Sequence, residues 1–239
     1  MKIVPRIWIF VLAGIVLGAG SARASDFEPA RIKHRDLPAF PAELLDLGVR
    51  DGSAVVAFDV NRAGTVDDCL AIACTDAGFA RVAVAAVRRW TFDPAQIDGH
   101  PVGTTGRVAM HFQVRGPVVV SLNVNGLVAM RMYQIGHPDT GFSVVGPGEL
   151  DRVPRALVTA EPAFSQHMAT KGEVGEVRVD FYIDRTGAVR LPAVGPGVDP
   201  RLAALAIGAL RKWKFERPTR RGRPVLVRAS QVFEFRAAG

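Results

Sequence analysis

The chain has 239 residues, of which 49% are hydrophobic and 22% are charged. This apolar content is enough to bury the core of one large or two small domains, and it excludes a disordered chain. The formal net charge is +7, and the first 24 residues carry three cations and no acid, so the rest of the chain has a charge of +4 and is only mildly basic.

The N-terminus has the pattern of a secretory signal. Lys2 and Arg6 precede an apolar run from Ile7 to Ala19, and small residues then end at Ala24 in an A-x-A cleavage pattern before Ser25. The apolar run is shorter than the ~20 residues that a helix needs to cross a bilayer. We therefore expect cleavage between Ala24 and Ser25 and an exported, soluble protein. An uncleaved inner-membrane anchor is the alternative.

An internal repeat follows. When the sequence is shifted by 123 residues, the segment from Gly52 to Phe112 aligns without a gap with Gly175 to Phe235. The identities are dispersed over the whole segment, which predicts a duplicated domain. The most similar pair of motifs is RRWTFDP, which begins at Arg88, and RKWKFERP, which begins at Arg211.

Within each unit the patterns predict, in chain order, a short helix, a hairpin, a longer helix and a last strand. The short helices are expected at Pro41 to Leu47 and at Ser165 to Ala169. Alternating apolar residues predict the hairpin strands, joined by NRAG at Asn61 and DRTG at Asp184, whose glycines permit a positive φ.

The longer helix ends at the repeated tryptophan motif. Asp199 and Pro200 form an N-cap and first-turn pair, and apolar residues then recur at helical spacing. We place the cations of the motif in the last helical turn, where they oppose the negative end of the dipole. We interpret its aromatic residues as core residues rather than a ligand platform: Trp90, Phe92, Trp213 and Phe215.

These elements predict an α+β fold of two tandem α-β-β-α-β units, each a small antiparallel sheet with helices on one face. The expected ranges are a signal peptide at 1–24, a first unit at 38–115, and a second unit at 151–236. Residues 116–150 are expected to hold an extra hairpin and a Gly/Pro-rich linker. The hairpin is expected because apolar residues alternate from Val118 to Val124, before the Asn125-Gly126 turn.

The two cysteines, Cys69 and Cys74, are candidates for a disulfide because export places them where such bonds persist. In an extended segment their Cα atoms would lie roughly 16 Å apart, too far for a bond, so the disulfide requires a turn between them. Two separate thiols are the alternative.

The motifs of both units resemble the TonB C-terminal domain family. The first unit carries PAFP, GSAVVAFDVNRAGTV and AVRRWTFDP, and the second carries PAFS, GEVRVDFYIDRTGAV, ALRKWKFERP and GRPVLVRASQVFEF. The resemblance implies a periplasmic domain. It also implies binding to an outer-membrane transporter or another extended protein segment by strand pairing. Separately, the absence of catalytic and cofactor motifs leads us to expect no catalysis and no cofactor.

By position, the resemblance places the partner-binding strand in the second unit, where an open sheet edge is a template for another strand. We expect prolines at Val227 and Val232 to weaken partner binding while leaving the fold mostly intact. Two alternatives remain: an inner-membrane energy transducer, and a scaffold whose units pair with each other. The candidate strand residues are Val225, Val227, Ala229, Gln231, Val232 and Phe235.

The remaining features give no further site. A basic cluster in the second unit is interpreted as a solvated hairpin tip: Arg217, Arg220, Arg221, Arg223 and Arg228. The alternative is contact with a membrane surface, through the first four, or with acidic residues of a partner. The histidines lack metal-ligand spacing, and no catalytic motif is present, so neither a metal nor an enzyme is expected. Nucleic acid is not expected as a partner, and the oligomeric state stays open.

Overall fold

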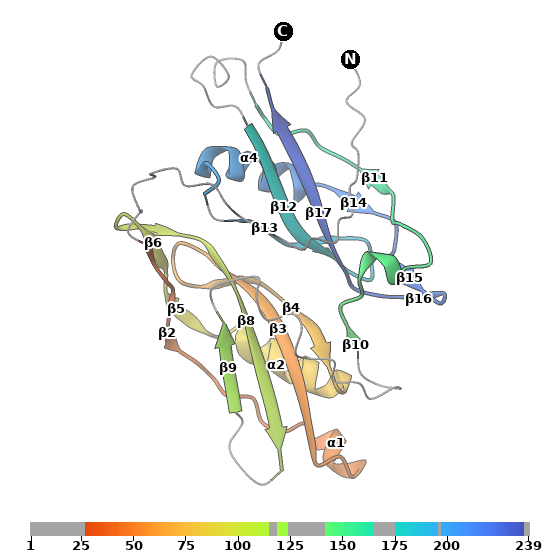
Figure 1. The fold of residues 1–239 in the computed structure, drawn as a ribbon. Helices are drawn as coiled ribbons and strands as arrows, with labels where there is room; N and C mark the ends of the chain where they lie inside the picture. Colours follow the sequence, from red (N-terminus) through yellow and green to blue (C-terminus); the bar gives the residue numbers. More distant parts are fainter. Residues whose placement is uncertain (1–26, 115–118, 124–141, 165–174, 196, 237–239) are drawn as a thin grey trace, which may run out of the picture. The chain divides into compact units, whose positions relative to one another are not determined.

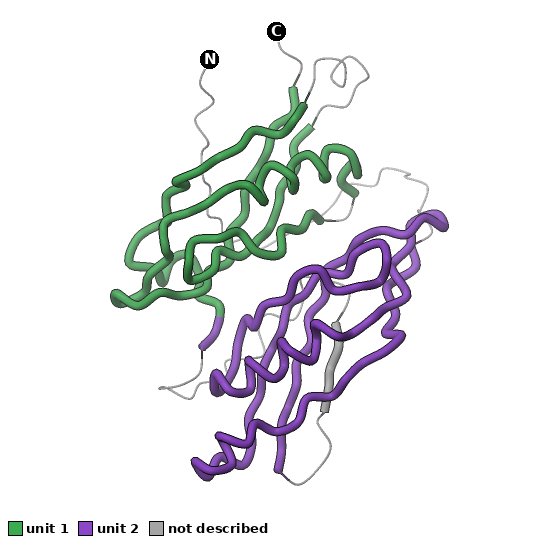
Figure 2. Tube along the Cα trace, turned by 180° about the vertical axis from the view of Figure 1, so that it is seen from behind, with its two compact units in different colours: residues 1–17, 144–239 green, residues 18–143 purple. Residues whose placement is uncertain are grey.

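The structure is a computed structural model, and it describes residues 27–114, 119–123, 142–164, 175–195 and 197–236. The chain divides into two compact units, whose described residues fall within 18–143 and 144–239 (Figure 2). We call them the N-terminal unit and the C-terminal unit. The predicted signal peptide and its cleavage site lie outside the described residues.

The N-terminal unit contains a five-stranded antiparallel sheet in the order β10-β4-β3-β8-β9 (Figure 1). Its three central strands are β3 (Asp51–Val60), β4 (Val66–Cys74) and β8 (Thr104–Gln113). The two edges are β9 (Val119–Asn123) and β10 (Phe142–Ser143). The short helix α1 (Ala42–Asp46) precedes the sheet, and α2 (Ala77–Val87) packs on β3 and β4.

Short strands extend this unit beyond the predicted elements. One group is a three-stranded sheet of β1 (Phe27–Glu28), β6 (Ala95–Ile97) and β7 (His100–Val102). The other is the pair β2 (Arg31–His34) and β5 (Thr91–Asp93). The part TFD (Thr91–Asp93) of the first tryptophan motif is therefore a strand, which pairs with β2, before the first helix.

The C-terminal unit has a three-stranded antiparallel sheet in the order β13-β12-β17, covered by the helix α4 (Pro200–Leu210) (Figure 1). The strands are β12 (Gly175–Ile183), β13 (Val189–Val194) and β17 (Val227–Phe235). Two short pairs flank the sheet: β11 (Ala156–Val158) with β14 (Lys214–Phe215), and β15 (Thr219–Arg220) with β16 (Arg223–Pro224). A 3-10 turn, η1 (Pro147–Glu149), precedes them.

The two predicted hairpin turns are confirmed, and they use the same chemistry. Asn61 Oδ1 accepts hydrogen bonds from the backbone N–H of Ala63 and of Thr65. Asp184 Oδ1 accepts them in the same way from Thr186 and Ala188. These side-chain acceptors hold each loop closed.

The repeated tryptophan motif is also confirmed as a core element. Trp90 is 1% exposed and Trp213 is 6% exposed. The indole Nε1 of Trp90 donates to the carbonyl of Asp36 at 2.9 Å, and that of Trp213 donates to the carbonyl of Ala160 at 2.8 Å. The motif thus ties the end of the longer helix to the segment that follows β2 in the N-terminal unit and β11 in the C-terminal unit.

The same motif explains the glycine of each hairpin turn. The backbone N–H of Phe92 donates to Gly64 O at 2.8 Å, and that of Phe215 donates to Gly187 O at 2.8 Å. A Cβ atom at Gly64 would lie 1.9 Å from the Phe92 carbonyl oxygen, and φ there is +80°. Only glycine meets both demands.

The helix ends differ slightly from the prediction. Asp199 caps α4 as expected, since its carboxylate accepts from the backbone N–H of Arg201 and Leu202. Arg88 and Arg211 are the C-cap residues of α2 and α4, so the cations begin where each helix ends rather than within its last turn. The tryptophans follow the helices and do not belong to them.

The α+β fold class is confirmed, and the two-unit α-β-β-α-β arrangement stays a prediction. The helix α1 forms where it was expected, but the corresponding segment at 165–169 lies outside the described residues. Of the predicted extra hairpin, β9 is present, and its Asn125-Gly126 turn lies outside the described residues.

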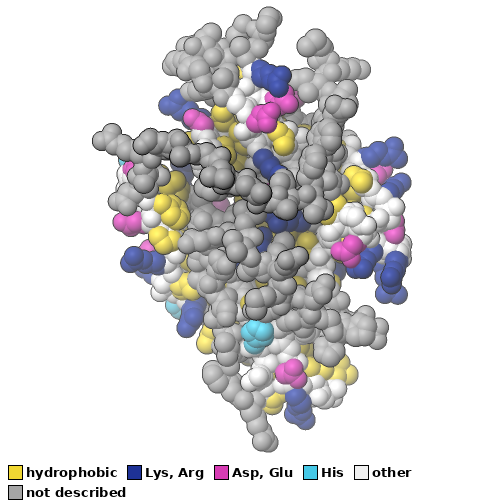
Figure 3. Space-filling view, in the orientation of Figure 1, with side chains coloured by type: hydrophobic (Ala, Val, Ile, Leu, Met, Phe, Trp, Pro, Cys, Tyr) yellow, Lys and Arg dark blue, Asp and Glu magenta, His cyan; other side chains and the backbone are white. Residues whose placement is uncertain are grey.

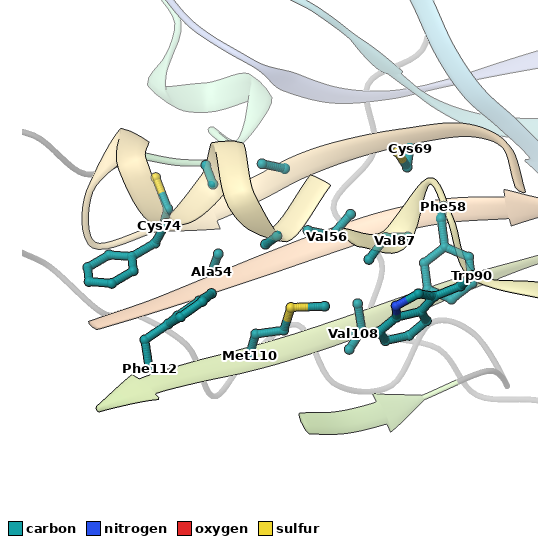
Figure 4. Packing of buried hydrophobic residues seen from close by; sticks show 14 of the residues in the cluster. Ala54, Val56, Phe58, Cys69, Cys74, Val87, Trp90, Val108, Met110 and Phe112 are labelled. Carbon is teal, nitrogen blue, oxygen red and sulfur yellow. The ribbon is translucent and has the colours of Figure 1, made fainter. Parts of the chain in front are cut away.

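The predicted disulfide is wrong. Cys69 and Cys74 are reduced, buried residues of one continuous strand, β4, which has no turn between them. Figure 4 shows the two side chains well apart along this strand. Both pack in the apolar core of the N-terminal unit, where cysteine acts as a small hydrophobic residue.

Candidate functional site

The outer edge of β17 is the candidate site, and the hydrogen bonds around it show which backbone groups it offers. Along a strand, the N–H and C=O of one residue point to the same side, and successive residues alternate. The N–H of Asp184 donates to Ala188 O at 2.9 Å, on the β13 side of β12. Even-numbered residues of β12 therefore face β13, and odd-numbered residues face β17.

This alternation carries over to β17 through its register. Ile183 lies opposite Val227 and Gly175 lies opposite Phe235, with nine continuous pairs between β12 and β17. Odd-numbered residues of β17 therefore bond to β12. The N–H and C=O groups of Ser230, Val232 and Glu234 are directed to the outer edge.

The start of this edge is already occupied by the chain itself. Val145 forms a parallel bridge with Val227, and its N–H donates to Leu226 O at 2.9 Å. Within the described residues, no strand pairs with β17 beyond this bridge on the outer side. The segment Ser230–Glu234 is therefore an exposed template for another strand.

A buried glutamine covers one of the outward acceptors. Gln231 is only 7% exposed, because this polar residue lies on the core-facing side of β17. Its Nε2 donates to the carbonyl oxygen of Val232 at 2.8 Å. Gln231 therefore satisfies a backbone group that an added strand would otherwise bond.

The opposite edge of the sheet is a poorer template. In β13, Leu191 has a φ of +48°, and the pairing with β12 shifts register between Asp180 and Tyr182. Pro192 follows and has no N–H to donate. Irregular backbone and proline are common means of blocking an edge, which leaves β17 as the regular one.

The predicted strand residues fall into three groups. Val225 lies before β17, between β16 and the strand. Val227, Ala229, Gln231 and Phe235 alternate on the core-facing side, and only Val232, at 38% exposed, faces away from the core.

This arrangement corrects the expectation for a proline at Val227. The N–H of Val227 is directed to β12, so a proline there would break the sheet itself. Ser230 and Glu234 were missed, because alternation in the sequence shows which face a side chain takes but not which neighbour its backbone bonds.

An apolar hollow adjoins the same strand. It is lined on one side by Leu150, Val153 and Pro154, and on the other by residues that include Phe181, Phe215 and Ala229. Val153 is half exposed. The hollow therefore offers a shallow apolar contact surface next to the edge of β17.

Four residues of the predicted basic cluster lie at or beside the β15–β16 hairpin, which acidic neighbours hold, whereas Arg228 lies in β17 and pairs with Asp180. Asp151 accepts hydrogen bonds from the backbone N–H of Arg221 at 2.6 Å and of Gly222 at 2.8 Å. The bonds from Gly222 and Arg221 and one from the Thr219 side chain hold the pKa of Asp151 below its ordinary value. Glu149 forms an ion pair with Arg220 at 2.9 Å.

Figure 3 shows lysine and arginine side chains lying among aspartates and glutamates on the face in view. This environment fits the interpretation of the cluster as a solvated hairpin. Contact with a membrane surface stays a prediction.

The described residues hold no group of three or more His, Cys, Asp or Glu residues able to bind a metal ion. The helices of the described part of the chain are too short or too polar to cross a membrane.

The family model for the C-terminal domain of the Gram-negative bacterial TonB protein matches residues 36–114 and 160–237. The two matches together cover more than half of the chain. The chain belongs to the TonB C-terminal family. A comparison with curated proteins found no match.

TonB C-terminal domains are non-enzymatic interaction domains that pair strands with outer-membrane transporters, and the family links this chain to TonB-dependent transport in the cell envelope. The second TonB C-terminal match contains the whole of β17. The first match ends at residue 114, just after β8, so β9 and β10 lie outside it. The strands at the two edges of the N-terminal sheet thus lie outside the matched residues.

Proposed function

We propose that this protein binds an extended segment of a cell-envelope partner as an added strand on the outer edge of β17, over Ser230–Glu234. The observation that carries this proposal is the regular, open edge of β17 in a domain whose family acts through strand pairing. The backbone groups of Ser230, Val232 and Glu234 provide the pairing. Affinity then comes from the main chain, and specificity comes from the flanking side chains.

The flanking groups suggest the kind of segment that fits. On the core side, the shallow hollow beside Val153 and Phe215 offers an apolar contact surface. On the other side, Arg178 and Arg228 both contact Asp180, which leaves a surface of mixed charge. We therefore expect a partner strand with apolar residues at alternate positions and no requirement for a strong net charge.

The location follows from the same proposal. A partner in the envelope requires export, and the N-terminal sequence pattern predicts cleavage before Ser25. Mass spectrometry of the protein purified from its host should find Ser25 as the first residue. A chain that begins at Met1 and sediments with the inner membrane would instead support the anchored energy transducer.

The binding edge is tested by a proline that removes one outward N–H. Val232→Pro takes away a donor of the edge but no bond to β12, so the fold should persist while binding is lost. The probes are synthetic peptides that copy periplasm-exposed segments of the host's outer-membrane transporters. We expect the affinity of a binding peptide to fall at least about tenfold, because each backbone bond contributes roughly 1 kcal/mol and neighbouring pairs are disturbed too.

Val232→Thr is the matched control, because it keeps a β-branched side chain and the backbone N–H. It should bind like the wild type. Equal binding by the proline and threonine variants, with intact folding by circular dichroism, would show that this edge is not the site.

A further inference from the structure

The N-terminal unit has the same edge as the C-terminal unit, but its own chain covers it. A shift of 123 residues places Arg107–His111 of β8 on Ser230–Glu234 of β17. In β8 this segment is paired with β9, from Arg107 opposite Asn123 to His111 opposite Val119 (Figure 1). The position proposed for a partner strand in one unit is thus filled by an intramolecular strand in the other.

The backbone directions agree in the two units. The N–H of Val114 donates to Arg50 O at 3.1 Å, so even-numbered residues of β8 face β3. Arg107, Ala109 and His111 therefore face β9, where Ser121 lies opposite Ala109. These three residues are the counterparts of Ser230, Val232 and Glu234.

We propose that the N-terminal unit holds a second strand-binding edge, over Arg107–His111, which β9 closes as an intramolecular occupant. Displacement of β9 opens this edge to an extended peptide segment. The inference rests on strand pairing as the function of the C-terminal unit, and it adds a second, closed site to it.

Two features mark β9 as an occupant rather than as part of the domain. It lies outside the family match, which ends at residue 114. The strand β9 is also only five residues long. By contrast, β3 lies on the other side of β8 and pairs with β8 over ten positions. The matched domain therefore does not include β9, and a competing strand has few bonds to replace.

The test uses a proline in β9. Ser121→Pro removes the N–H that faces Ala109, whereas Leu122→Pro removes one that faces away from β8 and serves as the matched control. Both variants are made in the full chain that carries Val232→Pro, so that the edge of β17 is blocked. The probe is a fluorescent peptide with the sequence VVVSLNV, which is that of residues 118–124.

We expect the Ser121→Pro protein to bind one equivalent of this peptide, at least about tenfold more tightly than the Leu122→Pro protein does. The amides of Arg107, Ala109 and His111 should be protected from hydrogen exchange in the wild type and lose protection in Ser121→Pro. Because β17 is blocked in every sample, this result does not depend on whether the proposed site there is correct.

Two outcomes would overturn the proposal. One is a Ser121→Pro protein whose three amides exchange freely but which binds no more peptide than the control. The other is unfolding of the N-terminal unit when Val119–Asn123 is replaced by a Gly/Ser sequence, since β9 would then be a structural strand and not a removable one.

Discussion

The two units have separate cores that are built in the same way, and they differ at the edges of their sheets. Both bury the tryptophan motif and close their hairpins with the same turn chemistry, but β8 is covered by β9 whereas β17 is open over Ser230–Glu234. A duplicated domain can therefore keep its packing unchanged and still gain or lose a binding edge. The change requires only a short strand outside the domain.

One core-facing position also differs between the unit with the covered edge and the unit with the open edge. Val108 in β8 is completely buried, and its counterpart in β17 is Gln231, whose side chain bonds the outward carbonyl of Val232. The covered edge needs no such bond, because β9 lies along it. At the edge of β17, Gln231 donates to the Val232 carbonyl, which a neighbouring strand would otherwise bond. Inward-pointing polar side chains are a known way to protect a sheet edge.

The largest expected effect concerns what the units share. Trp90→Ala and Trp213→Ala should each destabilise the unit that carries the substitution by about 3–5 kcal/mol, because each removes a buried indole and its hydrogen bond. Without residues 1–24 the chain has only these two tryptophans, so each variant keeps one fluorescent reporter in the other unit. Urea unfolding followed by that reporter should be unchanged. A parallel loss in both units would show that they do not fold independently.

A second prediction exchanges the core-facing position in the covered unit. Val108→Gln should destabilise the N-terminal unit by about 1–3 kcal/mol more than Val108→Met, which adds a similar volume without an amide. The reason is that β9 already bonds the outward groups of β8, so the buried amide finds no partner. Thermal unfolding measures the difference. Equal stability of the two variants would mean that the edge of β8 is accessible to the glutamine.

The reverse exchange, at Gln231 of β17, should tighten partner binding at the open edge. Gln231→Met keeps the length of the side chain and releases the Val232 carbonyl, so a partner strand no longer competes with the amide. We expect binding to the C-terminal unit to tighten about 2- to 10-fold, the equivalent of one net hydrogen bond of about 0.5–1.5 kcal/mol. Fluorescence anisotropy with a binding transporter peptide measures it. Weaker binding by the variant would assign Gln231 a direct role in partner contact.

The smallest expected effect is local and depends on pH. The pKa of Asp151 is lowered in the folded state, so its hold on the β15–β16 turn is fully present above its ordinary value of 3.8 and is lost as the pH falls through the folded value. The protection of the Arg221 and Gly222 amides, taken relative to their intrinsic exchange rates at each pH, should therefore fall at acid pH. Asp151→Asn should remove most of this pH dependence. A turn that responds to acid equally in both proteins would exclude Asp151 as the cause.

Much of the fold was predictable because it depends on local patterns. The turn residues at Asn61 and Asp184, the cap at Asp199 and the buried Trp90 and Trp213 each act within a few residues or within one apolar stripe. The disulfide prediction was wrong for a related reason. Two cysteines five positions apart fit a turn or a strand equally well, and pairing of β4 with β3 from Val66 to Cys74 selects the strand.

The amino-acid sequence alone established the duplication, the family resemblance and the faces of the strands, since a shared pattern and a period of two are visible along the chain. The open edge was a different kind of property. It depends on the register of β12 against β17, which directs the backbone of Ser230 and Val232 outward, and on the pairing of β9 with β8. Every residue except proline has the same backbone N–H and C=O groups, so the sequence does not show with which strand they pair. Only the folded sheet shows which edge is covered and which stays unpaired among the described residues.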